Sequence, residues 1–166
     1  DKDEGGFIRD AFDSLRTLGI CSEDTYPYNI SDVFRQPPLA CYAEANDNKI
    51  EAYYRIASTG TQRLDDIEHA LRLNHPVVFA TAVSADFTKY FWGNEQDVWK
   101  TPTSSVGNHA MIVTGFKYEN GKRKFKIRNS WGNWGVDGHT WFSEEYLASP
   151  VTFDLWVPTF VPDLLM

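Results

Sequence analysis

An Asn-Gly pair between two strand-like segments constrains the fold of this chain more than any other feature. Residues 110–114 read Ala-Met-Ile-Val-Thr, residues 125–128 read Phe-Lys-Ile-Arg, and Asn120-Gly121 lies between them. Because both turn residues accept positive φ angles, the segment is expected to form an antiparallel β-hairpin. His109 stands at the entrance of this hairpin and Asn129 at its exit.

The other segments predict an α+β fold in which helices come first and antiparallel strands follow. Apolar residues at helical spacing run from Phe7 to Leu18, and Gly19 is expected to end that helix. Residues 24–39 are rich in Pro and aromatic residues, which predicts an ordered loop. The remaining expected elements are a strand at 50–56, a helix at 64–74, strands at 77–83 and 140–142, a helical turn after Ser143, and a last strand at 153–157. The length of 166 residues predicts one domain over residues 1–166, with a division into two lobes left open.

The charge balance argues against two classes of partner. Sixteen Lys and Arg against 23 Asp and Glu give a net charge of −7, which repels phosphate backbones and anionic lipids. Neither a nucleic acid nor a membrane is therefore expected as a partner. The His and Cys residues lack metal-ligand spacing, so neither a metal nor another cofactor is expected. A pI of about 5.0 slightly favours a secreted or vesicular location but also suits cytosolic proteins.

The turn type decides whether His109 and Asn129 can meet. A two-residue turn would place Asn129 opposite Ile112, on the face of the sheet that points away from His109. A type I turn followed by Gly121 in a left-handed bulge would instead place Asn129 opposite Met111. His109 and Asn129 would then be diagonal neighbours on one face, about 7–8 Å apart at the backbone. We expect the bulged turn.

A His ring held by an Asn amide, with an indole such as that of Trp131 beside it, is the orienting half of a nucleophile–base–orienter system. The Asn would fix the ring angle and tautomer, and the indole would keep water away from the contact. The alternative is a strand-edge His and a turn Asn that are merely close in space.

The sequence on both arms of the hairpin resembles the papain-like cysteine peptidases. The resemblance is strongest in Gly107–Val113 and in Arg128–Gly138, where Asn-Ser-Trp-Gly-Asn-Trp-Gly-Val-Asp-Gly runs from Asn129 to Gly138. Three further segments agree in order, namely Gly5-Gly6 before a helix, Thr25-Tyr26-Pro27-Tyr28 after it, and Asn74-His75-Pro76-Val77. The resemblance implies a papain-like fold, with a helical N-terminal part followed by an antiparallel sheet or barrel lobe.

The resemblance also implies a role for individual residues. His109 would be the general base and acid, Asn129 would orient it, and Trp131 would shield the pair with support from Trp134. The residues expected to contact a peptide or protein substrate are Gly5, Gly6, Ala80, Asn108 and Ala110. The implied activity is peptide-bond hydrolysis through an acyl-thioester.

One part of the family pattern is missing from this sequence. Papain-like enzymes carry the nucleophilic Cys about 130–150 residues before the His and Asn, which would place it upstream of Asp1. The nucleophile, with a Gln of the oxyanion hole, is therefore expected in an N-terminal segment or a separate chain. Neither Cys21 nor Cys41 has the helix-start setting of an activated thiol, and Cys41 is expected in an irregular segment. Asp3-Glu4 replace a Cys that the family usually carries, and the sequence leaves a bridge between Cys21 and Cys41 open.

Two other functions remain as alternatives. The chain could be a papain-fold binding or regulatory module that has lost its nucleophile. A weaker alternative is a Trp-rich carbohydrate-binding domain, for which Trp92 and Trp99 would be the stacking residues. The pair of His109 and Asn129 favours the enzyme, because a binding module gains nothing from it.

Overall fold

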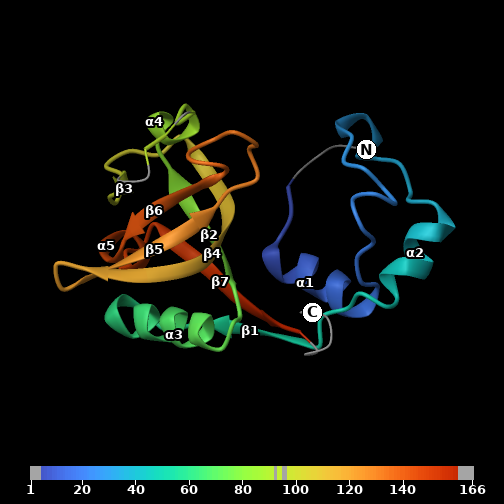
Figure 1. The fold of residues 1–166 in the computed structure, drawn as a ribbon, viewed down its shortest axis with the longest axis horizontal. Coiled ribbons are helices and arrows are strands. Elements are labelled where there is room, and N and C mark those ends of the chain that lie inside the picture. The colour runs from blue at the N-terminus through green and yellow to red at the C-terminus, as the bar shows by residue number, and fades with distance from the viewer. Residues whose placement is uncertain (1–4, 92, 95–96, 161–166) are drawn as a thin grey trace. The chain divides into compact units, whose positions relative to one another are not determined.

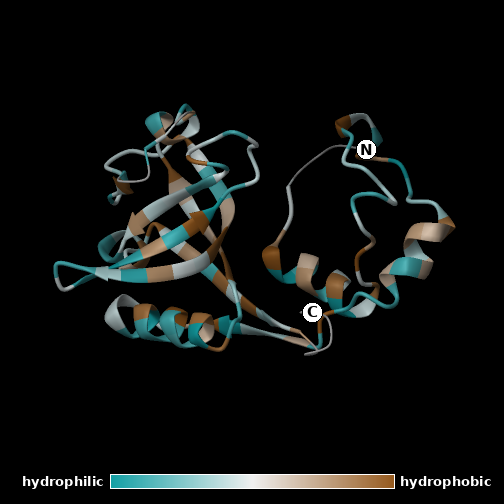
Figure 2. Ribbon diagram, in the orientation of Figure 1, coloured by the Kyte–Doolittle hydropathy of each residue, from teal (hydrophilic) through white to brown (hydrophobic). Residues whose placement is uncertain are grey.

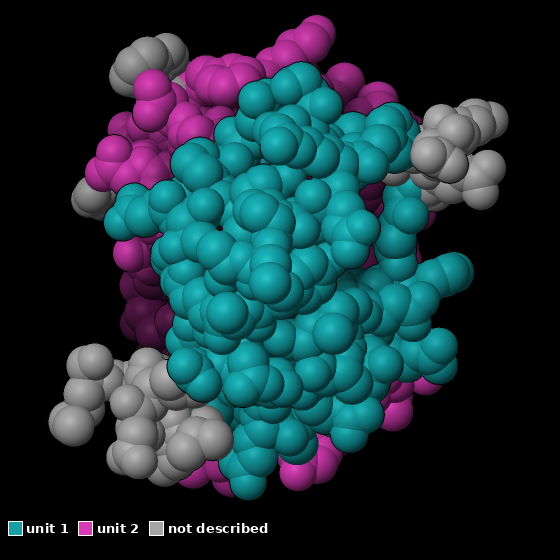
Figure 3. Space-filling view, turned by 90° about the vertical axis from the view of Figure 1, so that its right-hand side faces the viewer, with its two compact units in different colours: residues 1–53, 158–166 teal, residues 54–157 magenta. Residues whose placement is uncertain are grey.

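The protein forms two compact units in the computed structural model (Figure 1). The structure describes residues 5–91, 93–94 and 97–160. The first unit comprises residues 1–53 and 158–166, and the second comprises residues 54–157, as coloured in Figure 3. Strands β1 (Ala52–Ile56) and β7 (Thr152–Thr159) carry the chain from one unit to the other. No helix within the described residues is long and apolar enough to cross a bilayer.

The first unit is helical and has a small core. Its helices are α1 (Ile8–Thr17), the 3-10 helix η1 (Ile30–Asp32) and α2 (Leu39–Ala45). The buried apolar residues described between positions 5 and 53 are Phe12, Cys41, Ala45 and Ile50. The helix expected at the N-terminus is present, but Phe7 and Leu18 at the ends of its apolar stripe are 75% and 54% exposed.

Two local features of this unit depend on single residues. Gly19 follows α1 with a φ of 84°, and a Cβ there would lie 1.8 Å from the carbonyl oxygen of Ala45, so this close approach requires glycine. Cys41 lies within helix α2, which corrects the expectation that it belongs to an irregular segment. Pro38 occupies the N-cap, and the seven residues after it include good helix formers, so a helix begins where the Pro pair ends.

The second unit is built on a sheet whose strand order is β1-β7-β2-β4-β5-β6-β3. Its other strands are β2 (Val77–Val83), β3 (Val98–Trp99), β4 (Gly107–Glu119), β5 (Lys122–Arg128) and β6 (His139–Ser143). Its helices are α3 (Gly60–Arg72), α4 (Ala85–Thr88) and α5 (Glu144–Ala148). β3 and β6 are parallel, whereas β2, β4, β5 and β6 pair with antiparallel neighbours. The α+β class is confirmed, and in the described part of the chain the sheet is open rather than closed into a barrel.

The core of the second unit lies on one face of this sheet. Alternate residues of the strands point into it, as expected for strands that are buried on one side, and hydrophobic and hydrophilic residues are interleaved along them (Figure 2). The core side chains include Val77, Phe79, Met111, Val113, Phe125, Ile127 and Phe142 from the strands and Leu64 and Ile67 from α3. This face matters for the site because His109 belongs to the same alternation as Met111 and Val113.

A buried arginine ties α3 to the end of the sheet. The Nη1 atom of Arg63 donates to the carbonyl oxygens of Leu147, Ser149 and Thr152 at 3.0, 3.1 and 2.8 Å. Its Nε atom donates to the carbonyl oxygen of Ser58 at 3.1 Å. These bonds give buried carbonyl groups around the turn between α5 and β7 a side-chain donor.

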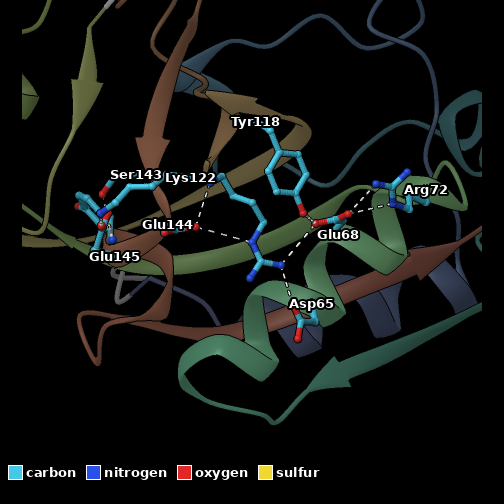
Figure 4. A network of polar contacts seen from close by, with 10 residues as sticks. Asp65, Glu68, Arg72, Tyr118, Lys122, Ser143, Glu144 and Glu145 are labelled. Carbon is cyan, nitrogen blue, oxygen red and sulfur yellow. Dashed lines mark hydrogen bonds and ion pairs between the residues drawn. The ribbon is translucent and has the colours of Figure 1, made fainter. Parts of the chain in front are cut away.

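A polar network joins α3 to the central hairpin (Figure 4). Glu68 of α3 accepts hydrogen bonds from the hydroxyl of Tyr118 and from Nη2 of Arg72, each at 2.7 Å. Nη1 of Arg123 lies 2.6 Å from Oδ1 of Asp65 and 3.4 Å from Oε2 of Glu68. The hairpin is thus held to α3 at the end opposite to His109.

The turn of the hairpin differs from the one expected. Glu119 pairs with Lys122, and the two residues between them, Asn120 and Gly121, have φ angles of 52° and 75°. Two positive φ angles in a two-residue loop are the pattern of a type I′ turn. The prediction of a three-residue bulged turn is therefore wrong.

The register shifts inside β4 instead, between Val113 and Gly115. Thr114 is the extra residue at this β-bulge, and beyond it Ile112 pairs with Arg128. This is the register that the bulged turn would have produced. A bulge in the strand therefore gives the same register at the far end of the hairpin as a bulge in the turn would give, and the candidate site residues lie at that end.

Candidate active site

His109 and Asn129 meet at the end of the hairpin farthest from its turn. His109 is in β4, and Asn129 follows β5 directly. Nε2 of His109 lies 2.7 Å from Oδ1 of Asn129, which confirms the expected contact. Asn129 is buried and His109 is half-buried, so surrounding protein covers most of the contact.

A second hydrogen bond determines the direction of the first. The backbone N–H of Ser130 donates to the same Oδ1 of Asn129 at 2.8 Å, which fixes that atom as the carbonyl oxygen of the amide. Nε2 of His109 must therefore carry the proton and donate it to Oδ1. The neutral ring then has its lone pair on Nδ1, and among the described residues Nδ1 has no hydrogen-bond partner. Ser130 was not singled out in the sequence, although its place directly after Asn129 is the signal for it.

Two tryptophans support the pair. The ring of Trp131 stacks on that of His109 with the centroids 4.2 Å apart and the planes 25° from parallel. Trp134 is fully buried, and its Nε1 donates to the carbonyl oxygen of Phe87 at 2.7 Å. Trp134 contacts Trp131 edge to face, with the centroids 6.1 Å apart. The indole expected beside His109 is thus that of Trp131, and Trp134 packs behind it, whereas Phe87 is distant in sequence and gave no signal.

The glycines of the segment after Asn129 shape the turn that holds these groups. Gly132, Gly135 and Gly138 have φ angles of 58°, 66° and 75°. A Cβ on Gly135 would lie 2.3 Å from the carbonyl oxygen of His139, and the carbonyl oxygen of Gly138 accepts a hydrogen bond from the N–H of Asn129 at 2.8 Å. The spacing of the glycines therefore reflects one compact turn that returns to Asn129.

An apolar cavity of about 330 Å³ adjoins Asn129. Its lining comes from three neighbouring strands and the residues after them, namely Val78, Ala110, Met111, Ile112, Arg128, Asn129 and Ser130. Ala80 and Ala110 are direct cross-strand partners, and Asn108 is paired with Ala82. Of the expected substrate contacts, Ala110 thus lines the cavity, and Ala80 and Asn108 lie near it on the same two strands.

The other expected substrate contacts belong to the first unit. Gly5 and Gly6 are exposed, and a Cβ built on either glycine would have no neighbour within 4 Å. Cys21 and Cys41 are also in the first unit and carry free thiols. In the part of the chain that the structure describes, no group of three or more His, Cys, Asp or Glu residues could hold a metal ion.

Trp99, one of the two tryptophans considered for sugar binding, packs against Phe87 and Tyr90 at centroid distances of 5.0 and 5.1 Å. It contributes to the aromatic cluster beneath the site. Trp92 lies outside the described residues.

A sequence model of the papain family cysteine proteases matches residues 3–149. The chain belongs to the papain family of cysteine proteases. Among curated relatives, it is 33% identical to bovine pro-cathepsin H over 139 residues, covering 82% of this chain and 39% of that protein. It is 29% identical to falcipain-3 of Plasmodium falciparum over 170 residues, covering 95% of this chain and 32% of that protein. The chain thus spans about two fifths or less of these two relatives.

Solved structures of papain-family proteases share the fold. Xylellain, a cysteine protease from Xylella fastidiosa, superposes with a TM-score of 0.78 at 31% identity, over 97% of this chain and 64% of that one. The bromelain protease from Ananas comosus superposes with a TM-score of 0.67 at 24% identity, over 95% of this chain and 71% of that one. The expected papain-like architecture is confirmed by these likenesses.

Proposed function

We propose that this chain supplies the histidine and asparagine of a cysteine peptidase active site, and that the working enzyme hydrolyses peptide bonds. The observation that carries the proposal is the oriented ring of His109. Its Nε2–H is held by an amide oxygen that is itself fixed by Ser130. In this arrangement Nδ1 is the basic nitrogen, as a general base requires.

The nucleophile in this proposal is a cysteine of an N-terminal segment or of a partner chain. Nδ1 of His109 takes the proton of that thiol, and the thiolate attacks the carbonyl carbon of the substrate. The imidazolium then gives its proton to the leaving amine, which leaves an acyl-thioester. Nδ1 next takes a proton from water, whose oxygen attacks the thioester and releases the carboxylic acid and the thiol.

Asn129 and Trp131 act on this cycle through His109. The fixed amide keeps the ring at one angle through both proton transfers, so the ring does not have to be reoriented in each step. The stacked indole of Trp131 covers one face of the ring and restricts its rotation. We regard both as positioning residues rather than as groups that touch the substrate.

The substrate in this proposal is an extended peptide. Ala110 would form part of a subsite for an apolar side chain, because it lines the apolar cavity next to Asn129. Ala80, its cross-strand partner, and Asn108, two residues before it in β4, would extend this surface. Gly5 and Gly6 would offer backbone hydrogen bonds, since neither has a side chain that hinders an approaching strand.

The alternative of an inactive binding module predicts no role for the protonation of His109. The hydrogen bond from Ser130 favours the peptidase over this alternative, because it fixes the Asn129 amide that orients the ring of His109. The two functions differ in one measurable property, namely turnover that depends on His109.

The test is hydrolysis of fluorogenic peptides by the full-length protein, with all upstream and partner segments present. His109→Ala should lower kcat by about 10²- to 10⁴-fold, the usual contribution of a general base. His69→Ala, which changes an exposed histidine of α3, is the matched control and should retain wild-type activity. Equal turnover by wild type and His109→Ala would contradict the assigned base, and no turnover by the wild type on a broad peptide library would favour the binding module.

A further inference from the structure

The first unit contains a long loop that has no core of its own. Between Cys21 and the start of α2 at Leu39 the chain forms one turn of 3-10 helix and otherwise turns and extended segments, and none of residues 22–40 is buried. Large apolar side chains in this loop, such as Tyr28 and Phe34, are 79% and 61% exposed. A loop of this length that buries so little apolar surface requires another constraint to remain ordered.

At the base of this loop, the segment that leads into it lies close to α2 and to the residues just after α2. The N–H of Ile20 donates to the carbonyl oxygen of Asn48 at 3.1 Å, and the N–H of Ser22 donates to Oε1 of Glu44 at 2.8 Å. Gly19 approaches the carbonyl of Ala45. Residues 19–22 therefore run along the C-terminal end of α2 and the residues just after it, and Cys21 lies in the middle of this contact.

Cys41 lies on the same side of α2 as the groups that hold this segment. It precedes Glu44 and Ala45 by three and four residues, which is the spacing of neighbours on one helix face. The two cysteines therefore lie at opposite ends of the loop and beside the same face of α2. Cys41 belongs to the helix, and Cys21 belongs to the segment that runs along it.

The two thiols differ in accessibility. Cys41 is 3% exposed, whereas Cys21 is half-buried. Burial raises the pKa of Cys41, and a hydrogen bond with Cys21 raises it further. This interaction agrees with the backbone contacts that place residues 20–22 beside Glu44 and Asn48. An external oxidant would therefore react first at Cys21.

We propose that Cys21 and Cys41 form an intramolecular disulfide that closes the loop of residues 22–40. The Cys21 thiolate attacks a low-molecular-weight disulfide such as oxidised glutathione, which gives a mixed disulfide and one glutathione thiolate. The Cys41 thiolate then attacks the Cys21 sulfur and displaces the second glutathione thiolate. The protein loses two electrons and two protons, and one oxidised glutathione becomes two reduced molecules.

The disulfide has a structural purpose in a unit of this kind. A cross-link at the base of the loop lowers the entropy of the unfolded chain, and small units with few buried side chains are commonly stabilised in this way. It would fix residues 19–22 beside α2 in addition to the hydrogen bonds from the N–H groups of Ile20 and Ser22. The proposal does not depend on the peptidase function, because neither cysteine takes part in that reaction.

Peptide mapping tests the bridge directly. Trypsin cuts after Arg16, Arg35 and Lys49, so the two cysteines fall in separate peptides, residues 17–35 and 36–49. The full-length protein is incubated with oxidised glutathione, alkylated under denaturing conditions, digested and analysed by mass spectrometry. We expect the two peptides to be joined and to separate after dithiothreitol treatment. Recovery of both as separate alkylated peptides, or of glutathione on Cys21 without the cross-link, would overturn the proposal.

A stability measurement gives a second readout. The melting temperature of the oxidised wild type should exceed that of the reduced protein by about 5–10 °C. Cys21→Ser, which changes the half-buried partner, should fold but show the same melting temperature with and without dithiothreitol. An equal redox effect in wild type and Cys21→Ser would mean that the stabilisation arises elsewhere and that this bridge is absent.

Discussion

Nε2 of His109 lies 2.7 Å from Oδ1 of Asn129, and Oδ1 accepts its second hydrogen bond from the N–H of Ser130. The amide oxygen is therefore saturated by two donors from fixed directions. Rotation of the Asn129 amide would place its NH₂ group against both donors, which costs the energy of two hydrogen bonds. The ring of His109 is held in one tautomer by this arrangement.

Asn129→Ala is expected to lower kcat by about 10- to 100-fold, less than the loss of the base itself, with little change in KM. The ring would keep its stacking on Trp131 but lose its fixed angle and tautomer. Steady-state kinetics with a fluorogenic peptide measures both parameters. Asn133→Ala, at an exposed asparagine of the same turn, is the control. A kcat that is unchanged in Asn129→Ala would show that the amide does not orient the ring.

The contact between His109 and Asn129 could be predicted from the sequence, but the position of the β-bulge that sets their register could not. The Asn-Gly turn and the residue types on each arm are local signals. The bulge at Thr114 is not, because it depends on how β4 packs simultaneously on β2 and β5. A threonine in a strand gives no indication that it will be left unpaired.

Other parts of the fold could not be predicted from the sequence for a similar reason. Helix α2 begins directly after Pro37-Pro38, and a helix of seven residues carries too few apolar repeats to stand out. The roles of Phe87 and Arg63 arise from contacts with residues distant in sequence, such as Trp134 and Thr152. The segment from Asn129 to Gly138, by contrast, forms one local turn and could be interpreted directly.

Gly121→Val tests the two-residue turn. Gly121 has a φ of 75°, which a β-branched residue adopts only with strain, so the free energy of unfolding should fall by about 1–3 kcal/mol. Chemical denaturation measures this change. Activity of the folded variant should stay close to wild type, because the bulge at Thr114 lies between the turn and His109. Gly121→Asn should lose less stability, since asparagine tolerates positive φ. Equal stability of the valine variant and wild type would argue against the type I′ turn.

Arg63→Met is expected to be strongly destabilising. Methionine fills much of the same space but removes the hydrogen bonds that the guanidinium donates to the carbonyl groups of Leu147 and Thr152. The expected loss is about 3–5 kcal/mol in the free energy of unfolding, measured with urea. Arg72→Met, in the same helix, removes an arginine whose side chain is 60% exposed and should cost about 1 kcal/mol or less. A similar loss for the two variants would show that the buried hydrogen bonds of Arg63 contribute little.

The network around Glu68 predicts how stability depends on pH (Figure 4). Burial disfavours the charged form of Glu68, but hydrogen bonds from Tyr118 and Arg72 outweigh it and lower its pKa. A carboxylate whose pKa is lower in the folded state contributes stability above its unfolded pKa, about 4.3, and this contribution is lost as the pH falls through the folded value. Glu68→Gln should therefore be about 1–2 kcal/mol less stable than wild type at pH 7, and the difference should shrink towards pH 3.

The measurement is the free energy of unfolding from urea titrations at a series of pH values between about 3 and 7. Glu51→Gln, which changes an exposed carboxylate outside the network, is the control and should follow the wild-type curve. If the difference between wild type and Glu68→Gln were constant over this range, the ionised carboxylate would not be the source of the stabilisation. The loss would then arise from the altered geometry of the hydrogen bonds to Tyr118 and Arg72, which a neutral amide makes less well than a carboxylate.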